Sequence, residues 1–336
     1  METARDELSW LGFVVPRQAL QLLASRVPLS RLRDALPASV VARLRLGLYP
    51  ARVERAGAPA CERRHPGWGD PAELDPARPV AMPEAPRASV LIVTYGNLAL
   101  VRLTLAAVQR AATTTPYEII VVDNASPDGT LAALRGIEAG GLLPLRVVAN
   151  PANRGFAAAN NQAARLARAE ALVFLNPDTV VTDGWLDHLV GHLDADATVG
   201  LVGPSTNACG HPDVEVPALY RDLPAMEAFA AAYTARHAGE LRDVTMMPLF
   251  CAAMRHSLFT EVGGLDEDYG VGMFEDDDLA MAVRRRGGRV TVARDAFVHH
   301  YGGASFGSLS QLRYLRIFWE NRRRFEKKWG ERWRER

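Results

Sequence analysis

The side chains with the clearest capacity for chemistry are four consecutive carboxylates, Glu275, Asp276, Asp277 and Asp278. They stand directly before an apolar helical pattern that closes at residues 286–288. Carboxylates this close repel one another, and the repulsion raises the pKa of at least one of them toward the range of a general base. Acids at a helix start also gain from the helix dipole, by roughly 0.3–1 kcal/mol each. The run therefore predicts either a helix cap or a reaction centre, and a cap explains one or two acids more easily than four.

Polar residues also follow two strand-like apolar runs, Thr94-Tyr95 after the first and Asp123-Asn124 after the second. An acid and an amide can pair with the polar edge of a nucleotide base, and Tyr95 offers a ring for stacking. The same positions suit a capped turn, because residues 126–129 read Ser-Pro-Asp-Gly, which is strong turn chemistry. The pattern fits both a base-binding site and an ordinary turn.

Asn153, Arg154 and Gly155 open the next helix-like segment. Backbone N–H groups and a cation at a helix start can contact a diphosphate, and an ordinary Asn cap is the alternative. The sequence has no GxGxxG after the first strand and no P-loop pattern. The usual signatures of dinucleotide and ATP binding are therefore missing.

Two further segments could hold a metal ion. Asn176-Pro177-Asp178 follows the apolar run 171–175, and a lone carboxylate there suits Mg²⁺ or Mn²⁺ that shares oxygens with a diphosphate. His299 and His300 stand beside a Gly-Gly turn after a strand and could supply one metal ligand and one phosphate contact. An Asx turn and buried structural histidines are the alternatives.

The elements that must position these residues alternate between strands and helices. Such alternation predicts an α/β fold with a parallel sheet covered by helices. Ligands of such sheets lie outside the carboxyl ends of the strands, so Thr94-Tyr95, Asp123-Asn124 and Asn176–Asp178 should converge on one crevice. We expect strands at 89–94, 117–122, 145–149, 171–175 and 200–203, and helices near 98–112, 130–138, 157–169 and 183–193.

The composition divides the chain into four parts. Residues 1–50 alternate Leu or Val with Arg at helical intervals and predict a helical N-terminal extension, whereas residues 51–87 are rich in Pro, Gly, Ala and Arg and predict a linker. We expect the main domain at 88–305, with halves at 88–203 and 204–305. Residues 306–336 predict a basic amphipathic helix, with ten Lys or Arg against four Glu from Arg313 onward. That helix fits either peripheral contact with anionic lipid or a solvated packing helix.

Charge and cysteine usage exclude several classes of protein. Lys plus Arg equals Asp plus Glu at 39 each, so no overall field favours nucleic acid. The three cysteines are far apart and suggest neither a disulfide framework nor a zinc site. The first ten residues lack a signal-peptide layout, and no apolar run approaches the roughly 20 residues that span a bilayer. We therefore expect a cytoplasmic protein, with any membrane contact peripheral and at the inner face.

Taken as an ordered set, these segments resemble the family 2 inverting glycosyltransferases of the GT-A fold, and in particular their bacterial rhamnosyltransferase-like branch. The likeness runs from Ser89 to about Ser305, and each segment is weak alone. It implies a mostly parallel, Rossmann-like central sheet flanked by helices, with 88–203 as the nucleotide-sugar-binding half and 204–305 as the acceptor and catalytic half. The segments are SVLIVTYGN, VVDNASPDGT, NRGFAAANNQ, FLNPDT, GGLDE, FEDDDLAMAVRRRG and HHYGGAS.

The resemblance implies a role for each candidate residue. Asp178 matches the metal-binding carboxylate of the family's DxD motif, whose first position is Asn176 here, and His300 matches the later histidine of the metal and diphosphate site. Asp276 matches the catalytic base, with Glu275 before it. Asp277, Asp278 and His299 would lie on the acceptor side. The expected nucleotide-sugar contacts are Thr94, Tyr95, Asp123, Asn124, Asn153, Arg154, Gly155 and Asn176.

The implied reaction transfers a sugar from a nucleotide diphosphate sugar, such as dTDP-rhamnose or a UDP-sugar, to a hydroxyl of a glycan or lipid-linked acceptor. Such transfer serves the biosynthesis of bacterial cell-wall or surface polysaccharides. Asp276 would accept the hydroxyl proton, and Mg²⁺ or Mn²⁺ would stabilise the leaving diphosphate. The alternative is a non-catalytic module on the same fold that binds sugar nucleotides or glycans, because Asn176 replaces an acid.

Overall fold

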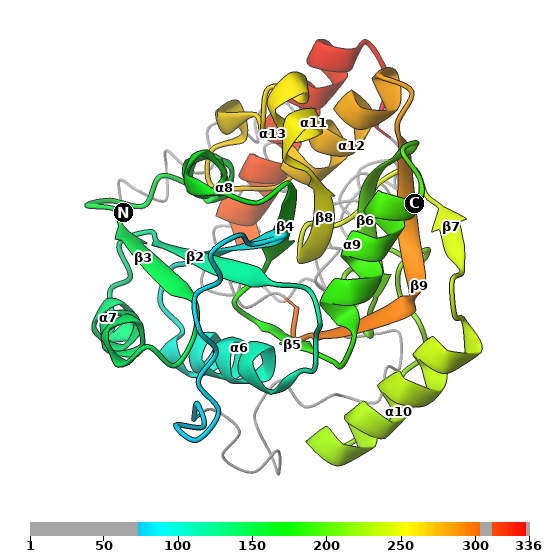
Figure 1. The fold of residues 1–336 in the computed structure, drawn as a ribbon. Coiled ribbons are helices and arrows are strands. Elements are labelled where there is room, and N and C mark those ends of the chain that lie inside the picture. Colours follow the sequence, from blue (N-terminus) through cyan, green and yellow to red (C-terminus); the bar gives the residue numbers. More distant parts are fainter. Residues whose placement is uncertain (1–72, 303–310, 334–336) are drawn as a thin grey trace, which may run out of the picture. The chain divides into compact units, whose positions relative to one another are not determined.

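The computed structural model describes residues 73–302 and 311–333. Residues 73–302 belong to one compact unit, while helix α13 (Gln311–Trp329) belongs to another, and each is described by itself (Figure 1). The predicted helical extension at 1–50, most of the predicted linker and Gly303–Ser305 lie outside the described residues.

Four parallel strands form one half of the central sheet, in the order β3-β2-β1-β4. In β1, β2 and β4 the Val, Ile and Leu side chains are almost completely buried, except for the half-buried Val93, as a sheet covered on both faces requires. The last two strands have the bounds that the sequence predicted, and the first two differ by one residue. The strands are β1 (Ala88–Thr94), β2 (Tyr117–Asp123), β3 (Leu145–Ala149) and β4 (Ala171–Leu175).

Helices cover both faces of this half. Helix α8 (Phe156–Leu166) packs on β1 and β2 from one side, and α6 (Leu98–Arg110) and α7 (Thr130–Gly140) lie on the other (Figure 1). Each helix follows a strand after a short loop. The loops after β1, β2 and β4 therefore emerge at the same edge of the sheet, as predicted.

The other half makes the sheet mixed rather than mostly parallel, which corrects the expectation from the sequence. Strand β8 lies antiparallel to both β4 and β6, β6 lies parallel to β9, and β5 and β7 lie antiparallel to β9. After residue 205 the chain no longer alternates one strand with one crossover helix, so the pattern that predicts parallel pairing is lost. These strands are β5 (Thr179–Val181), β6 (Val199–Ser205), β7 (Leu241–Asp243), β8 (Cys251–Arg255) and β9 (Arg289–His300).

The remaining helices brace the second half. Helix α9 (Trp185–Ala195) packs on β6, β8 and β9, and α10 (Leu223–Arg236) packs on β9. Helix α11 (His256–Val262) leads through the 3₁₀ turn η2 (Glu267–Tyr269) into α12 (Glu275–Arg285). The carboxylate run forms the whole first turn of α12, and basic residues occupy its last turn, so both ends complement the helix dipole.

The segment 73–87 contains no helix or strand, but it is attached to the domain. The Gln109 side chain of α6 accepts a hydrogen bond from the Asp75 N–H and donates to the carbonyls of Asp75 and Arg78. Leu74 and Val80 also pack against the core. This part of the predicted linker therefore behaves as part of the folded unit.

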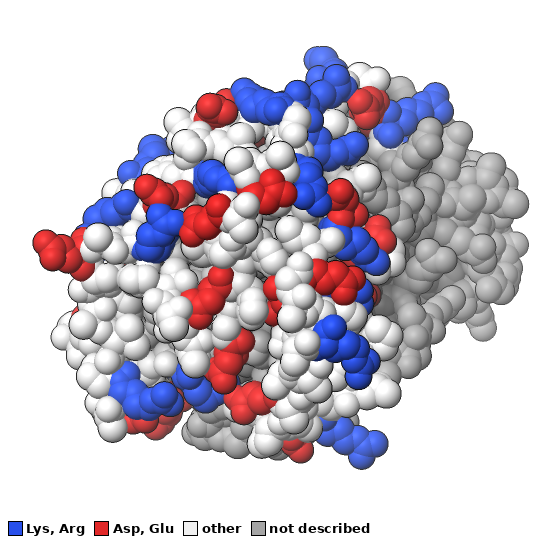
Figure 2. All heavy atoms as spheres, turned by 45° about the vertical axis from the view of Figure 1, so that its right-hand side comes forward, with Lys and Arg blue, Asp and Glu red and all other residues white. Residues whose placement is uncertain are grey.

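Helix α13 has a mixed surface: its aromatic side chains are half-buried, or buried at Phe325, and its cationic ones are exposed except for the half-buried Arg322. The Arg322 guanidinium lies 5.1 Å from the ring centre of Trp319 and 5.6 Å from that of Trp333. Within the described ranges, no helix combines the length and the apolar character needed to cross a bilayer. Figure 2 shows acidic and basic side chains interspersed over one face of the molecule, consistent with equal numbers of each in the sequence.

Candidate functional site

The side chains at the ends of β1 and β2 are hydrogen-bonded to each other and to the loop after β2. Thr94 pairs with Asp123 in the parallel register, and its hydroxyl donates to Asp123 Oδ1 at 3.1 Å. The N–H of Ser126 donates to the other oxygen, Oδ2, also at 3.1 Å. Both Thr94 and Asp123 are fully buried. Asp123 therefore fixes the loop after β2 with both carboxylate oxygens.

Asn124 uses all of its side-chain hydrogen-bonding groups inside the protein. Its Nδ2 donates to Asn153 Oδ1 at 2.9 Å and to the Gly155 carbonyl at 3.2 Å. Its Oδ1 accepts from Asn150 Nδ2 at 3.1 Å and from the Arg154 N–H at 3.0 Å. A buried amide has two donors and two acceptor positions. Asn124 therefore organises the loop 150–155, and no donor or acceptor is left for a nucleotide.

Gly155 joins this loop to the segment that precedes the carboxylate run. Its φ is +85°, and a Cβ placed on it would lie 2.0 Å from the Gly270 carbonyl oxygen. The next residue, Phe156, donates its N–H to the Val271 carbonyl at 3.4 Å. Only glycine fits this position, because any side chain would meet backbone atoms. The predicted nucleotide loop and the approach to α12 are thus in direct contact.

Three predicted nucleotide contacts remain on the surface. Tyr95 is 56% exposed, so its ring is available for stacking. Arg154 is also exposed, and among the described residues its guanidinium has no hydrogen-bond or ion-pair partner. Asn153 is exposed as well, but its Oδ1 is used within the loop, since it accepts from both Asn124 Nδ2 and the Gly155 N–H.

Asp178 and His300 meet across the antiparallel pair β5–β9. The register places Thr179 opposite His300, and His300 Nε2 lies 3.3 Å from Asp178 Oδ1. Both residues are buried, and Asp178 Oδ1 has no hydrogen-bond partner. Burial opposes charging of His300, but the negative charge of the neighbouring Asp178 carboxylate favours it, and the pKa of His300 is raised overall.

This pair has the chemistry of a metal site. His300 Nδ1 lies 2.8 Å from the Ala208 carbonyl and must donate to it, which leaves Nε2 facing the carboxylate. Metal-binding histidines are commonly oriented in this way. No group of three or more His, Cys, Asp or Glu suited to a metal occurs in the described part of the chain. Asp178 and His300 fit a divalent cation that takes its other ligands from water and a diphosphate.

Asn176 holds the turn that delivers Asp178. Its N–H donates to the Phe250 carbonyl at 2.7 Å, and its carbonyl accepts from the Thr179 hydroxyl at 2.8 Å. Its side chain is half-buried. The turn that delivers Asp178 is therefore held by the backbone groups of Asn176 and by the Thr179 hydroxyl.

His299 does not face an acceptor, contrary to its predicted place. It is fully buried within β9 and not after the strand, and its Nδ1 lies 2.6 Å from the Tyr220 hydroxyl. Burial, followed by the charge of His300, lowers the pKa of His299 to about 3. Successive strand residues point to opposite faces, so His300 reaches Asp178 while His299 packs among aromatic rings.

The four carboxylates of α12 separate into two pairs. Glu275 and Asp278, three residues apart, are buried on one face, whereas Asp276 and Asp277 are half-exposed. The chain reaches the helix through two bulky residues in the left-handed region, Met273 with φ 76° and Phe274 with φ 77°. Such strained positions persist where the surrounding structure enforces them, which is common at active sites.

The buried pair has its own interactions. Burial, followed by the charge of Asp276, raises the pKa of the Glu275 carboxyl to about 8, and Glu275 Oε2 has no hydrogen-bond partner. Asp278 Oδ1 accepts from the Tyr269 hydroxyl at 3.0 Å. Asp278 therefore anchors the loop before the helix and does not present its carboxylate at the surface. On the exposed side, Asp276 Oδ1 accepts from the Asp277 N–H at 2.9 Å.

Two groups of positioning residues were missed from the sequence. Asn161 of α8 donates to the Leu265 carbonyl and to Glu267, and accepts from the Leu265 N–H, so it fixes the loop before η2. The loop 206–216 contacts His300 through Ala208. The doubled Asn of NRGFAAANNQ was a signal for the first, but no pattern marked the loop.

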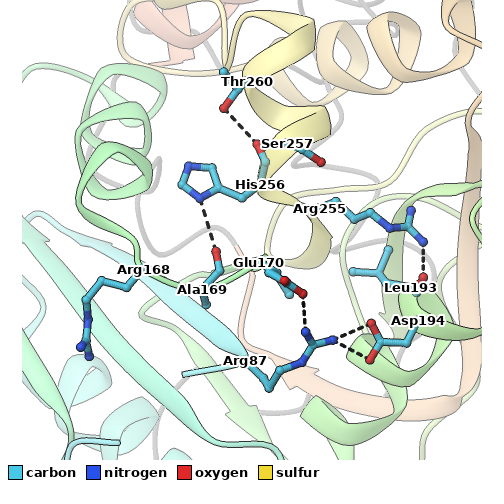
Figure 3. Close-up of a pocket in the computed structure, with 11 residues that line it drawn as sticks. Arg87, Arg168, Ala169, Glu170, Leu193, Asp194, Arg255, His256, Ser257 and Thr260 are labelled. Atoms are coloured by element: carbon cyan, nitrogen blue, oxygen red, sulfur yellow. Dashed lines mark hydrogen bonds and ion pairs between the residues drawn. The ribbon is translucent and has the colours of Figure 1, made fainter. Parts of the chain in front are cut away.

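A polar cleft lies away from these residues. Figure 3 shows Arg87 bonded to Glu170 and Asp194, and Arg255 bonded to the Leu193 carbonyl. The cleft, of about 530 Å³, is at the amino ends of β1 and β4, opposite the strand ends described above. Its arginines serve internal ion pairs and carbonyl contacts.

Known proteins share both the fold and the sequence pattern. TarS of S. aureus, solved with UDP-GlcNAc, has a TM-score of 0.50 at 17% identity, over 67% of this chain and 61% of that one. A structure of GalNAc-T7 with UDP, GalNAc and Mn²⁺ has a TM-score of 0.51 at 17% identity, over 65% of this chain and 44% of that one. These likenesses establish the GT-A fold.

Sequence relatives are longer than the region they share with this chain. The pre-mycofactocin glycosyltransferase of Mycobacterium tuberculosis is 30% identical over 54% of this chain and 37% of its own length. An uncharacterized protein of Sinorhizobium fredii is 27% identical over 67% of this chain and 26% of its own length. The family model for glycosyl transferase family 2 matches residues 89–263, which is just over half of the 336 residues. The chain therefore belongs to glycosyl transferase family 2.

Proposed function

We propose that the chain transfers a sugar, with inversion, from a nucleotide diphosphate sugar to a hydroxyl of a glycan or lipid-linked acceptor. The observation that carries the proposal is the division of the carboxylate run, which leaves Asp276 half-exposed while Glu275 and Asp278 are buried. Membership of glycosyl transferase family 2 supports the reaction class. Names of relatives, among them an O-antigen biosynthesis protein of Myxococcus xanthus, support a polysaccharide product.

The donor would bind at the carboxyl ends of β1 and β2. Tyr95 would stack on the base, and Arg154 would pair with the diphosphate. Thr94 and Asp123 would shape the base pocket through the loop they hold, while Asn124, Asn153 and Gly155 keep Arg154 in place. We propose a uridine or thymidine nucleotide, with dTDP-rhamnose and UDP-sugars as the donors to test first.

Asp178 and His300 would hold Mg²⁺ or Mn²⁺, with Asn176 forming the turn that delivers Asp178. A bound divalent cation supplies charge stabilisation to the departing diphosphate. The buried Asp178 Oδ1, which has no hydrogen-bond partner, and the His300 Nε2 that faces it at 3.3 Å support this assignment.

Asp276 would act as the general base. It accepts the proton of the acceptor hydroxyl while that oxygen bonds to the anomeric carbon, and the bond from this carbon to the diphosphate oxygen breaks in the same step. Both bonding electrons leave with the nucleoside diphosphate. One displacement inverts the anomeric centre, and no covalent intermediate is required. Glu275 would support Asp276 electrostatically, and Asp277 would contact the acceptor.

A screen of nucleotide sugars tests the donor and the metal together. UDP-, dTDP- and GDP-sugars are added with and without Mn²⁺ or Mg²⁺, and the melting temperature and donor hydrolysis are measured. We expect one nucleotide class to stabilise the protein only with a divalent cation, with slow hydrolysis of that donor. Binding without hydrolysis or transfer across many acceptors would instead favour the non-catalytic alternative.

Peripheral membrane contact through α13 is a separate part of the proposal. Arg316, Arg323 and Lys327 are exposed on this helix and Arg332 is exposed just after it, and such a basic surface is attracted to anionic lipid. We expect the protein to sediment with vesicles that contain one third phosphatidylglycerol. Changing Arg323, Lys327 or Arg332 to Gln should each weaken the free energy of vesicle binding by roughly 1 kcal/mol. Equal partitioning of the triple variant would remove the membrane role and leave the transferase proposal intact.

A further inference from the structure

The loop 206–216, between β6 and α10, contacts His300 through the Ala208 carbonyl, and the function proposed above gives its other residues no role. It begins where β6 ends, and Thr206 forms an isolated bridge with Glu215 that closes the loop at its base. The N–H of Thr206 donates to the Val214 carbonyl, and the Val216 N–H donates back to Thr206. The loop is therefore built with a fixed shape, although its sequence has no motif.

Asn207 clamps the backbone of His300. Its Nδ2 donates to the His300 carbonyl at 3.1 Å, and its Oδ1 accepts from the His300 N–H at 2.8 Å. A side-chain amide that takes both backbone groups of one residue replaces the missing pairing of a neighbouring strand. It therefore fixes the position of the His300 backbone at the end of β9.

Glu215 fixes the part of the loop that orients the His300 ring. Its Oε1 accepts from the N–H groups of Cys209, at 2.7 Å, and Gly210. These residues follow Ala208, whose carbonyl accepts from His300 Nδ1 at 2.8 Å. Charge-assisted hydrogen bonds of this kind are stronger than neutral ones. Glu215 thus holds the Ala208 carbonyl in the position that turns His300 Nε2 toward Asp178.

We propose that Asn207 and Glu215 are positioning residues that set the affinity of the Asp178–His300 pair for a divalent cation on the donor diphosphate. The proposal rests on the proposed function, because it assigns no metal beyond that one. The two residues act on different parts of His300, one on its backbone and the other on its ring, so loss of either should misplace Nε2.

The same loop reaches toward the proposed base. Burial raises the pKa of the Cys209 thiol, and the charges of Glu215 and Asp276 add to that effect. Cys209 therefore lies within electrostatic reach of Asp276, while its neighbour Ala208 contacts His300.

Mn²⁺ affinity in the presence of UDP or dTDP, measured by electron paramagnetic resonance of free Mn²⁺, tests the proposal without relying on activity. We expect Glu215→Ala and Asn207→Ala each to weaken Mn²⁺ binding about 10-fold or more. Glu215→Gln keeps an acceptor oxygen and should stay within about threefold of wild type. The control Asp213→Asn removes an acid of the same loop that pairs with Arg242, and should leave binding unchanged.

A double-mutant cycle separates positioning from general loss of structure. In a His300→Ala background, Glu215→Ala should cause no further loss of Mn²⁺ affinity, because its target is gone. Circular dichroism and the melting temperature establish that each variant is folded. If Glu215→Ala does not fold, Asn207→Ala takes its place in the test. Wild-type Mn²⁺ affinity in folded variants, or an equal loss with and without His300, overturns the positioning role alone. Failure of the wild type to bind Mn²⁺ with either nucleotide overturns the proposed metal site as well.

Discussion

The carboxyl ends of β1 and β2 and the start of α12 both carry buried acidic side chains, but the two regions differ in how the polar atoms of these side chains are paired. At the strand ends, Asp123 and Asn124 are buried and every side-chain oxygen and nitrogen has a partner. At the start of α12, Glu275 is buried with an oxygen that has no partner, and two bulky residues before it adopt positive φ values. In the first region every polar side-chain atom of these two residues has a hydrogen-bond partner. In the second, a buried carboxylate oxygen has none and the backbone conformation is strained.

This difference indicates which region is scaffold and which is suited to chemistry. A polar network with all partners present is rigid and holds a loop in one conformation. A buried carboxylate beside other acids has its pKa displaced, and displaced pKa values cluster at functional sites. The strand ends therefore hold their loops in place, whereas the α12 start gathers four carboxylates, of which the buried Glu275 has a raised pKa.

Replacement of the proposed base should have the largest effect on activity. Asp276→Asn keeps the shape but removes proton acceptance, so we expect kcat to fall about 10²- to 10⁴-fold with donor affinity unchanged. Single-turnover transfer and donor titration on the same protein measure both quantities. Asp277→Asn, at the other half-exposed position, is the matched control and should act mainly on acceptor KM. Undiminished turnover of Asp276→Asn would assign the proton to another group.

The junction between the two regions should be the most sensitive point for stability. Gly155→Ala places a Cβ against the Gly270 carbonyl at 2.0 Å in a backbone with φ +85°. We expect a loss of about 2–4 kcal/mol in the free energy of unfolding, together with weaker donor binding. Urea unfolding and donor titration measure the two effects.

Gly136→Ala in α7 is the matched control, because a Cβ there meets nothing within 4 Å. We expect it to raise the free energy of unfolding by about 0.5–1 kcal/mol, since alanine favours a helix. Similar stabilities for the two variants would show that the contact between the loops at 155 and 270 tolerates a side chain.

The sequence predicted the parallel half of the sheet well. Strands at 145–149 and 171–175 match to the residue, because turn residues bound each apolar run. The antiparallel strands β7 and β8 were not placed in the sheet, since their pairing is decided by partners far along the chain. Strand β8, for example, pairs with β4 about 80 residues earlier, as in Met254 with Leu172.

The residues of the candidate site were predicted in outline. Which of them are buried or saturated by internal hydrogen bonds, and which are exposed, was not predicted. Asn124 was predicted as a nucleotide contact, yet its four partners lie 26 to 31 residues away and saturate its amide. The burial of Glu275 and Asp278 was accessible in principle. Both lie on the helix face of Leu279 and Ala282, at helical spacing, whereas Asp276 and Asp277 do not.

The pH dependence of stability offers a smaller but sharper test of the two regions. In the folded protein the pKa of Glu275 is raised from 4.5 to about 8, first by burial and then by Asp276. Between these values the folded chain holds a proton that the unfolded chain has lost, so wild-type stability falls as pH rises through this window. Glu275→Gln removes the titration. We expect it to be more stable than wild type by about 1–3 kcal/mol at pH 8, and by little near pH 5.

Glu118→Gln supplies the control of opposite sign. Glu118 is also buried, but its hydrogen bonds with Arg168 and Ser89 outweigh the burial and lower its pKa below 4.5. The contribution of Glu118 to the free energy of unfolding is therefore present above pH 4.5 and is lost as the pH falls through the pKa of the folded state. The Gln variant should thus be less stable than wild type at neutral pH. Urea unfolding of both variants from pH 4 to 9 checks the signs. If the free energy of unfolding changes with pH in the same way for wild type and Glu275→Gln, the pKa of Glu275 is not raised by the fold. The contrast between the two regions would then be lost.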